Sequence, residues 1–142
     1  MSEEPENGAD DIEYLSVDSV LALHEVIIEG DERSEPGVQS EGDIEYALDH
    51  IEHGSFGERP GSIHEKAFQL LRLLVSGHPF VDGNKRTALQ SIVVFYEQNG
   101  YELRYGEDLE SLVRLLALDE RLIRPAPAVE YLSTRAIPTE DL

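Results

Sequence analysis

The chain has no cysteine and no tryptophan, and it has one methionine among its 142 residues. The lack of cysteine excludes disulfides, thiolate zinc sites and a cysteine nucleophile. No stretch approaches the roughly 18 consecutive apolar residues of a membrane span, and the N-terminus has neither the basic nor the apolar segment of a signal peptide. We therefore expect an unexported, cytoplasmic chain with no membrane partner.

Basic side chains are also scarce. The chain has 11 lysines and arginines against 30 aspartates and glutamates, which gives a net charge of −19. A field of this sign repels polyanions, so we expect no general binding of nucleic acids. A surface that is rich in acid and poor in lysine also suggests the hypothesis of a halophilic protein, in which concentrated salt screens self-repulsion.

Length and composition favour a single domain with an ordinary hydrophobic core, since 40% of the residues are hydrophobic. We expect a disordered acidic tail over residues 1–13, one domain over 14–136 and a C-terminal tail over 137–142. Residues 1–60 carry 18 acidic and two basic side chains (net −16), whereas residues 61–142 carry 12 and nine (net −3). Any anion site is therefore expected in the second part.

Apolar residues recur with helical spacing along most of the chain, which predicts an all-α bundle. Ser16 is expected to cap the first helix, Ser62 starts a capping box, and Asn99-Gly100 is a typical helix end. Residues 54–61 are rich in turn formers and are expected to form a connection or a small hairpin. The predicted helices cover residues 17–29, 44–51 (a shorter helix), 63–77, 84–98, 109–118 and 129–132.

The segment His78–Thr87, which joins the two most apolar helices, contains the residues that suggest chemistry. Gly83 and Asn84 permit a tight turn before a helix whose first N–H groups attract an anion. Lys85 and Arg86 add two cations there, where they oppose the helix dipole unless an anion is bound. The alternative is an ordinary turn in which Asp82, Gly83 and Asn84 merely cap the helix.

His78 and Asp82 complete a set that suits phosphoryl or nucleotidyl transfer. A histidine can take the proton of a hydroxyl nucleophile near neutral pH, and a carboxylate is the kind of ligand that Mg²⁺ uses when it also binds a nucleotide's phosphates. Such a reaction depends mainly on positioning and charge neutralisation, so a short loop can support it.

The same loop resembles the core motif of the Fic/Doc (Fido) family, His-x-Phe-x-(Asp or Glu)-Gly-Asn-Gly-Arg-x-x-Arg. The matching residues are His78, Phe80, Asp82, Gly83, Asn84 and Arg86. Lys85 replaces the second glycine and Leu89 replaces the final arginine, and both changes resemble the Doc (death-on-curing) branch. The resemblance extends over about residues 14–120 and implies a Fido-type helical bundle with a flap before the central helices, for which 54–61 is the candidate.

The resemblance implies a role for each motif residue. His78 would be the catalytic base, Asp82 the Mg²⁺ ligand, Phe80 the buried anchor, and Gly83, Asn84, Lys85 and Arg86 the groups that bind the phosphates of ATP.

It also implies the toxin of a toxin–antitoxin pair, which transfers the γ-phosphate of ATP to a Ser or Thr hydroxyl of a translation elongation factor and is silenced by an antitoxin protein. The alternatives are a transferase of AMP or another nucleotidyl group, and a non-catalytic module that binds a nucleotide or the antitoxin.

Several other segments receive a plainer interpretation. Residues 2–7 formally match the inhibitory motif of the family, but Pro5 disfavours a docked helix, so we expect inhibition by a partner chain. His50 and His53 have metal-ligand spacing without a third ligand nearby in the sequence. Lys66 and Arg72 are expected to solvate a helix face, although they could reach the phosphates. His24 and His64 are expected to be structural.

Overall fold

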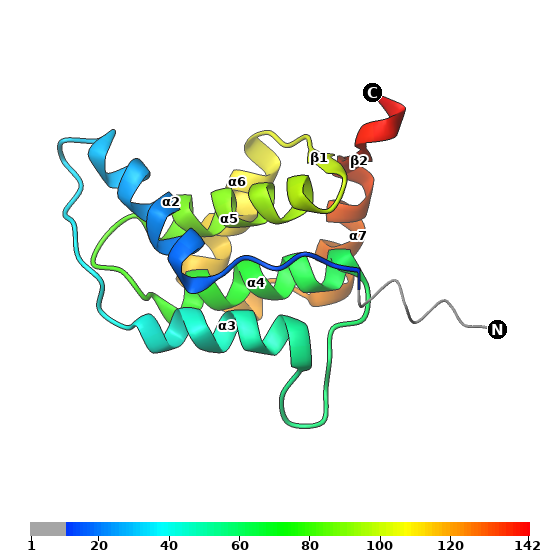
Figure 1. Ribbon diagram of the computed structural model, residues 1–142, viewed down its shortest axis with the longest axis horizontal. Helices are drawn as coiled ribbons and strands as arrows, with labels where there is room; N and C mark the ends of the chain where they lie inside the picture. The colour runs from blue at the N-terminus through cyan, green and yellow to red at the C-terminus, as the bar shows by residue number, and fades with distance from the viewer. Residues whose placement is uncertain (1–10) are drawn as a thin grey trace.

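A computed structural model, which describes residues 11–142, shows a helical bundle with one minute sheet (Figure 1). The strands β1 (Tyr101–Leu103) and β2 (Ala136–Pro138) are antiparallel, with Glu102 opposite Ile137. Two 3-10 turns, η1 and η2, cover Glu120–Leu122 and Thr139–Asp141. The helices are α2 (Val17–Glu29), α3 (Glu41–His53), α4 (Ile63–Gly77), α5 (Asn84–Gln98), α6 (Glu107–Leu118) and α7 (Pro125–Arg135).

Helices α4 and α5 lie side by side at the centre of the bundle, with α3 packed against α4 and α2 against α5 (Figure 1). The inward side chains of α4 and α5 are almost completely buried, which fits apolar residues on most of their faces. This pair forms the middle of the hydrophobic core, and its buried members include Phe68, Leu70, Leu71, Leu74, Ala88, Ile92, Phe95 and Tyr96.

The predicted helix starts are confirmed where a capping residue marks them. Ser16 accepts a hydrogen bond from the N–H of Ser19 at the start of α2. Ser62 and Glu65 form the expected reciprocal capping box at the start of α4. These three hydrogen bonds satisfy main-chain N–H groups at the helix starts locally, so the sequence signal and the structure agree.

Several predicted bounds differ from the structure, and the largest differences concern three segments. Helix α3 begins at Glu41, capped by Ser40, and with 13 residues it is as long as α2 rather than shorter. Helix α7 begins at Pro125, earlier than predicted, because proline is well tolerated in the first turn of a helix, where its missing N–H is not needed. Residues 137 and 138, predicted to lie in a tail, pair with β1, and no strand was predicted in either segment.

The N-terminal segment 11–16 runs along the bundle in an extended form (Figure 1). Leu15 is buried, Ile12 and Tyr14 pack against the core, and the N–H of Glu13 donates to Asn99 Oδ1 at 2.8 Å. Residues 11–13 of the predicted acidic tail are therefore attached to the domain. Residues 1–10, including the inhibitory-motif match at 2–7, lie outside the described residues.

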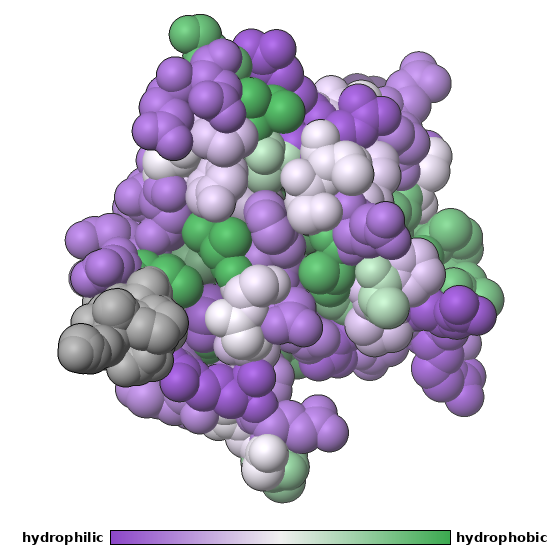
Figure 2. Space-filling view, turned by 90° about the vertical axis from the view of Figure 1, so that its right-hand side faces the viewer, coloured by the Kyte–Doolittle hydropathy of each residue, from purple (hydrophilic) through white to green (hydrophobic). Residues whose placement is uncertain are grey.

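The surface agrees with the acidic composition. Hydrophilic residues dominate the face drawn in Figure 2, and hydrophobic residues appear on it only as separate small groups. None of the helices within residues 11–142 combines the length and the apolar character that a membrane crossing requires.

Candidate functional site

The predicted loop connects the end of α4 to the start of α5, and a left-handed residue stands on each side of it. His78 ends α4 with φ 58° and ψ 53°, and its side chain is exposed. Gly83 precedes α5 with φ 81°, where a Cβ atom would lie 3.2 Å from Ile28 Cδ1. Glycine is favoured there by its backbone angle and by the close approach of α2.

Phe80 anchors the loop in the core, as the resemblance implied for it. Its side chain is 1% exposed, and its ring stacks on that of His24 with a centroid distance of 3.7 Å. The Asn84 side chain accepts a hydrogen bond from Phe80 N–H and donates one to Phe80 C=O, both at 2.9 Å. The side-chain amide of Asn84 is thus bonded to the loop backbone. The main-chain N–H of Asn84 takes no part in these two bonds and can bind an anion.

The Asp82 carboxylate is oriented by two main-chain groups. Its Oδ1 accepts from Gly83 N–H at 2.8 Å and its Oδ2 accepts from Glu35 N–H at 3.3 Å. The Asp82 carbonyl is bound at 2.8 Å by His24 Nε2, which must carry the proton of this hydrogen bond because a carbonyl only accepts. A carboxylate has about four acceptor positions, so Asp82 keeps capacity for a further partner.

Residues 37–40 form a short antiparallel pairing with the loop, with Val38 opposite Phe80. The N–H groups of Gln39 and Ser40 donate to Pro79 C=O at 2.7 and 3.0 Å, and Val81 N–H donates to Gly37 C=O at 3.0 Å. The Gln39 side-chain amide adds a bond of 2.8 Å to Phe80 C=O. The loop is therefore held from α2, from α5 and from residues 37–40.

The start of α5 has the properties of an anion site. No side chain of the described residues caps this helix, whose first residues are Asn84, Lys85 and Arg86. Lys85 is exposed and forms no ion pair within the described part of the chain. Free N–H groups, the positive end of the helix dipole and a lysine without a partner all favour a negatively charged ligand.

Arg86 is turned toward the segment that follows α2. Its guanidinium donates to Ser34 Oγ at 2.7 Å and lies 3.3 Å from Asp31 Oδ2. Hydrogen bonds from Arg33 N–H and Ser34, with the charge of Arg86, hold the pKa of Asp31 below its ordinary value. Because the pair is partly exposed, it is weak, and a phosphate can compete for Arg86.

The structure separates several other sequence candidates from this loop. Lys66 is completely buried and donates to Ile51 C=O at 2.6 Å, so the expectation that it solvates a helix face was wrong. Burial lowers the pKa of Lys66. Arg72 pairs with Glu120 at 2.6 Å and also donates to Gln69. These partners of both side chains therefore lie outside the His78–Thr87 loop.

The turn at 54–61 forms a single bridge between Ser55 and Glu58, as a small hairpin would, but it lies at the opposite end of α4 from His78 (Figure 1). Fifteen helical residues span about 22 Å. The suggested docking flap at 54–61 is therefore remote from the loop, and residues 37–40 occupy the adjacent position instead.

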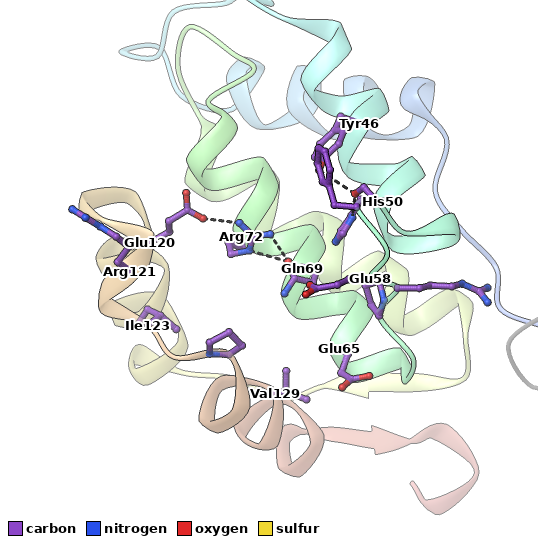
Figure 3. A pocket seen from close by; sticks show the side chains of 15 residues that line it. Tyr46, His50, Glu58, Glu65, Gln69, Arg72, Glu120, Arg121, Ile123 and Val129 are labelled. Carbon is purple, nitrogen blue, oxygen red and sulfur yellow. Dashed lines mark hydrogen bonds and ion pairs between the residues drawn. The ribbon is translucent and has the colours of Figure 1, made fainter.

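A cavity of about 740 Å³ lies beside this turn rather than beside the loop (Figure 3). Tyr46 and His50, which both bond to Ser55 Oγ, border it on one side, and Arg72 and Glu120 border it on another. None of the residues that line this cavity belongs to the predicted His78–Thr87 segment. His50 bonds to Ser55 and His53 to Asp49, so these two histidines do not form a shared metal site.

A group of three or more His, Cys, Asp or Glu side chains suited to a metal ion is absent from residues 11–142. The donor set at the loop consists of the single carboxylate of Asp82. This fits Mg²⁺ only in its common role with nucleotides, where one or two carboxylates, phosphate oxygens and water share the ion.

Two residues of the site were missed by sequence reasoning. His24 is structural, as expected, but its contacts with the loop were not foreseen: it stacks on Phe80 and binds Asp82 C=O. Gln39 was not singled out at all, although it binds Phe80 C=O. A histidine on an otherwise apolar helix face was the only signal for the first, and the sequence contains none for the second.

The helical fold and the His78–Arg86 loop define a protein of the Fic/DOC family. The family model for the Fic/DOC family matches residues 14–96, and the chain belongs to this family. The matched region ends within α5, short of residue 120. The chain is also similar to a protein named protein kinase doc from Escherichia phage P1, with 28% identity over 99 residues that cover 70% of this chain and 78% of that protein.

Proposed function

We propose that this chain is a Doc-like toxin that transfers the γ-phosphate of ATP to a Ser or Thr hydroxyl of a target protein. The observation that supports this most is the convergence of His78, the oriented carboxylate of Asp82 and the uncapped start of α5 in one loop. The similarity to a protein named a kinase favours phosphoryl transfer. Lys85 and Leu89, which depart from the glycine and arginine of the AMP-transferring motif, favour it too.

In the proposed reaction the target hydroxyl oxygen bonds to the γ-phosphorus while the bond from that phosphorus to the bridging oxygen breaks. His78 takes the hydroxyl proton, and ADP leaves with the electron pair of the broken bond. His78 suits this role because its exposed ring stands at the end of α4, accessible to a protein substrate.

The other groups of the loop would bind the phosphates and the metal ion. The N–H groups at the start of α5, Lys85 and Arg86 would bind the phosphates, while Asp82 would be the protein ligand of Mg²⁺. When bound, Mg²⁺ neutralises the charge of the phosphate oxygens. Phe80, Asn84 and His24 keep these groups in position through their packing and hydrogen bonds.

The biological setting that we propose follows the family resemblance. The target would be a translation elongation factor in the cytoplasm, and an antitoxin chain would silence the enzyme. The net charge of −19 suits partners that present basic segments rather than nucleic acid.

The experiment is transfer of radiolabel from ATP to proteins of a cell extract, with wild-type chain and a His78→Ala variant. Label transferred from γ-labelled ATP but not from α-labelled ATP supports a protein kinase, and the variant should lose the activity. Transfer from α-labelled ATP alone would favour the nucleotidyl transferase. If neither label is transferred and His78→Ala still arrests growth fully, the chain acts by binding and the enzymatic proposal fails.

A further inference from the structure

A shallow depression of about 210 Å³ lies between the first turns of α5 and the middle of α6. Leu89 and Val113, which are 9% and 4% exposed, supply its apolar part. A hollow of this size is smaller than the roughly 300–1,000 Å³ of most small-molecule pockets, so it suits a phosphate group rather than a whole nucleotide. The charged side chains that line it are Lys85, Arg86, Glu110 and Arg114.

The depression gathers an unusual share of the chain's positive charge. Three of 11 basic side chains border it, in a molecule of net charge −19. Lys85 and Arg86 come from α5, whereas Arg114 faces them from α6. Glu110 is the one acidic member, so the lining carries a net charge of +2.

Two of these cations are not neutralised by neighbouring acids. Among the residues that the structure describes, neither Lys85 nor Arg114 forms an ion pair, whereas Arg86 is paired with Asp31. Within residues 11–142, Arg114 donates to Ser111 Oγ on its own helix at 3.0 Å and to no acidic side chain. Glu110 precedes Arg114 by four residues, a spacing that favours helical ion pairs, and still the two remain apart. An anion between Lys85 and Arg114 would relieve their mutual repulsion.

Leu89, which lines the same depression, replaces a cation of the motif. Leu89 stands where the motif that the loop resembles ends in arginine, and it follows Lys85 by one helical turn on the same side of α5. α5 therefore lacks the cation of the motif, and α6 supplies one across the same depression. A guanidinium suits this task because it can bind phosphate oxygens with two parallel hydrogen bonds.

We propose that Arg114 is a phosphate-binding residue that, together with Lys85, contacts the polyphosphate chain of the nucleotide from the α6 side, in place of the arginine that Leu89 replaces. This inference rests on the proposed function, because it assigns a further contact to the same nucleotide.

The test is isothermal titration calorimetry with two probes, a non-hydrolysable ATP analogue with Mg²⁺ and inorganic tripolyphosphate. Arg114→Ala is compared with Arg114→Lys and with Arg124→Ala. Arg124 is a matched control, since it is also exposed, has no ion pair within residues 11–142 and lies at the start of α7. Arg114 lies on an exposed helix face, where alanine favours the helix, and circular dichroism checks the fold.

We expect Arg114→Ala to bind both probes about tenfold more weakly than the wild type, as for the loss of one charge-assisted hydrogen bond of about 1.4 kcal/mol. Arg114→Lys keeps the charge but not the paired hydrogen bonds, so its affinity should lie between those of Arg114→Ala and the wild type, and Arg124→Ala should bind like the wild type. Equal binding by Arg114→Ala and Arg124→Ala would overturn the inference while the proposed function stands. Binding of tripolyphosphate through Arg114 without binding of the ATP analogue would support the depression as an anion site and refute the nucleotide-dependent function.

Discussion

Replacing Asn84 by alanine is the sharpest test of how the loop is held. The side chain of Asn84 is 6% exposed and makes two hydrogen bonds of 2.9 Å to the main chain of Phe80. In the variant Phe80 C=O keeps its bond from the Gln39 amide, but Phe80 N–H loses its partner in a buried place. The variant therefore leaves one donor unsatisfied and removes one redundant bond.

The expected cost follows from these two losses. An unsatisfied buried donor costs about 1–3 kcal/mol and the second bond contributes about 1 kcal/mol. Alanine regains roughly 0.5 kcal/mol through its better helix propensity. We therefore expect Asn84→Ala to lower the free energy of unfolding by about 1.5–3.5 kcal/mol.

The assay is urea denaturation at constant pH, with Gln39→Ala as the matched control. Gln39 is exposed, and its loss leaves Phe80 C=O bound by Asn84, so that variant should lose no more than about 1 kcal/mol. A loss under about 0.5 kcal/mol in Asn84→Ala, or equal losses in both variants, would refute the view that Asn84 clamps the loop.

Three further predictions concern the backbone, pH and salt. Gly37 has φ 136° and a Cβ there would lie 2.8 Å from Val81 Cγ2, so Gly37→Ala should lose about 1–3 kcal/mol of stability in urea denaturation. It should lose more than Gly57→Ala, where φ is also positive but no atom lies within 4 Å; equal losses would contradict the clash. Burial lowers the pKa of His64, which bonds to Tyr96, so the unfolded chain binds this proton more readily and stability falls as pH drops below the ordinary histidine pKa of about 6.5. The stability lost between about pH 7.5 and pH 5 should therefore be smaller in His64→Gln, and an unchanged pH dependence would refute the assignment. Because 30 acidic side chains face 11 basic ones, the unfolding midpoint should rise from low to molar KCl, whereas a constant midpoint would sink the hypothesis of salt adaptation.

The parts of the fold that the sequence predicts are those with local causes. Ser16 and Ser62 cap helices through bonds to residues three positions away, and apolar spacing marks the buried faces of α4 and α5. The β1–β2 pair escaped prediction because each strand has three residues and their partners are far apart in the sequence. Strands this short leave no alternating pattern to detect.

The candidate site divides in the same way. The motif residues from His78 to Arg86 are contiguous, and the structure gathers them in one loop with an uncapped helix start. The residues that hold this loop act over long separations, 58 positions from His24 to Asp82 and 41 from Gln39 to Phe80. Periodicity and motif spacing carry no information on such pairs, and the catalytic roles of the motif residues stay predictions.

The most direct test of the proposed phosphate site is a crystal structure of this chain with Mg²⁺ and a non-hydrolysable ATP analogue. We expect the phosphates to lie at the N–H groups that begin α5, with Asp82 as the protein ligand of the metal and His78 beside the terminal phosphate. A nucleotide bound instead in the cavity next to the 54–61 turn (Figure 3), with the α5 start empty, would contradict the assignment.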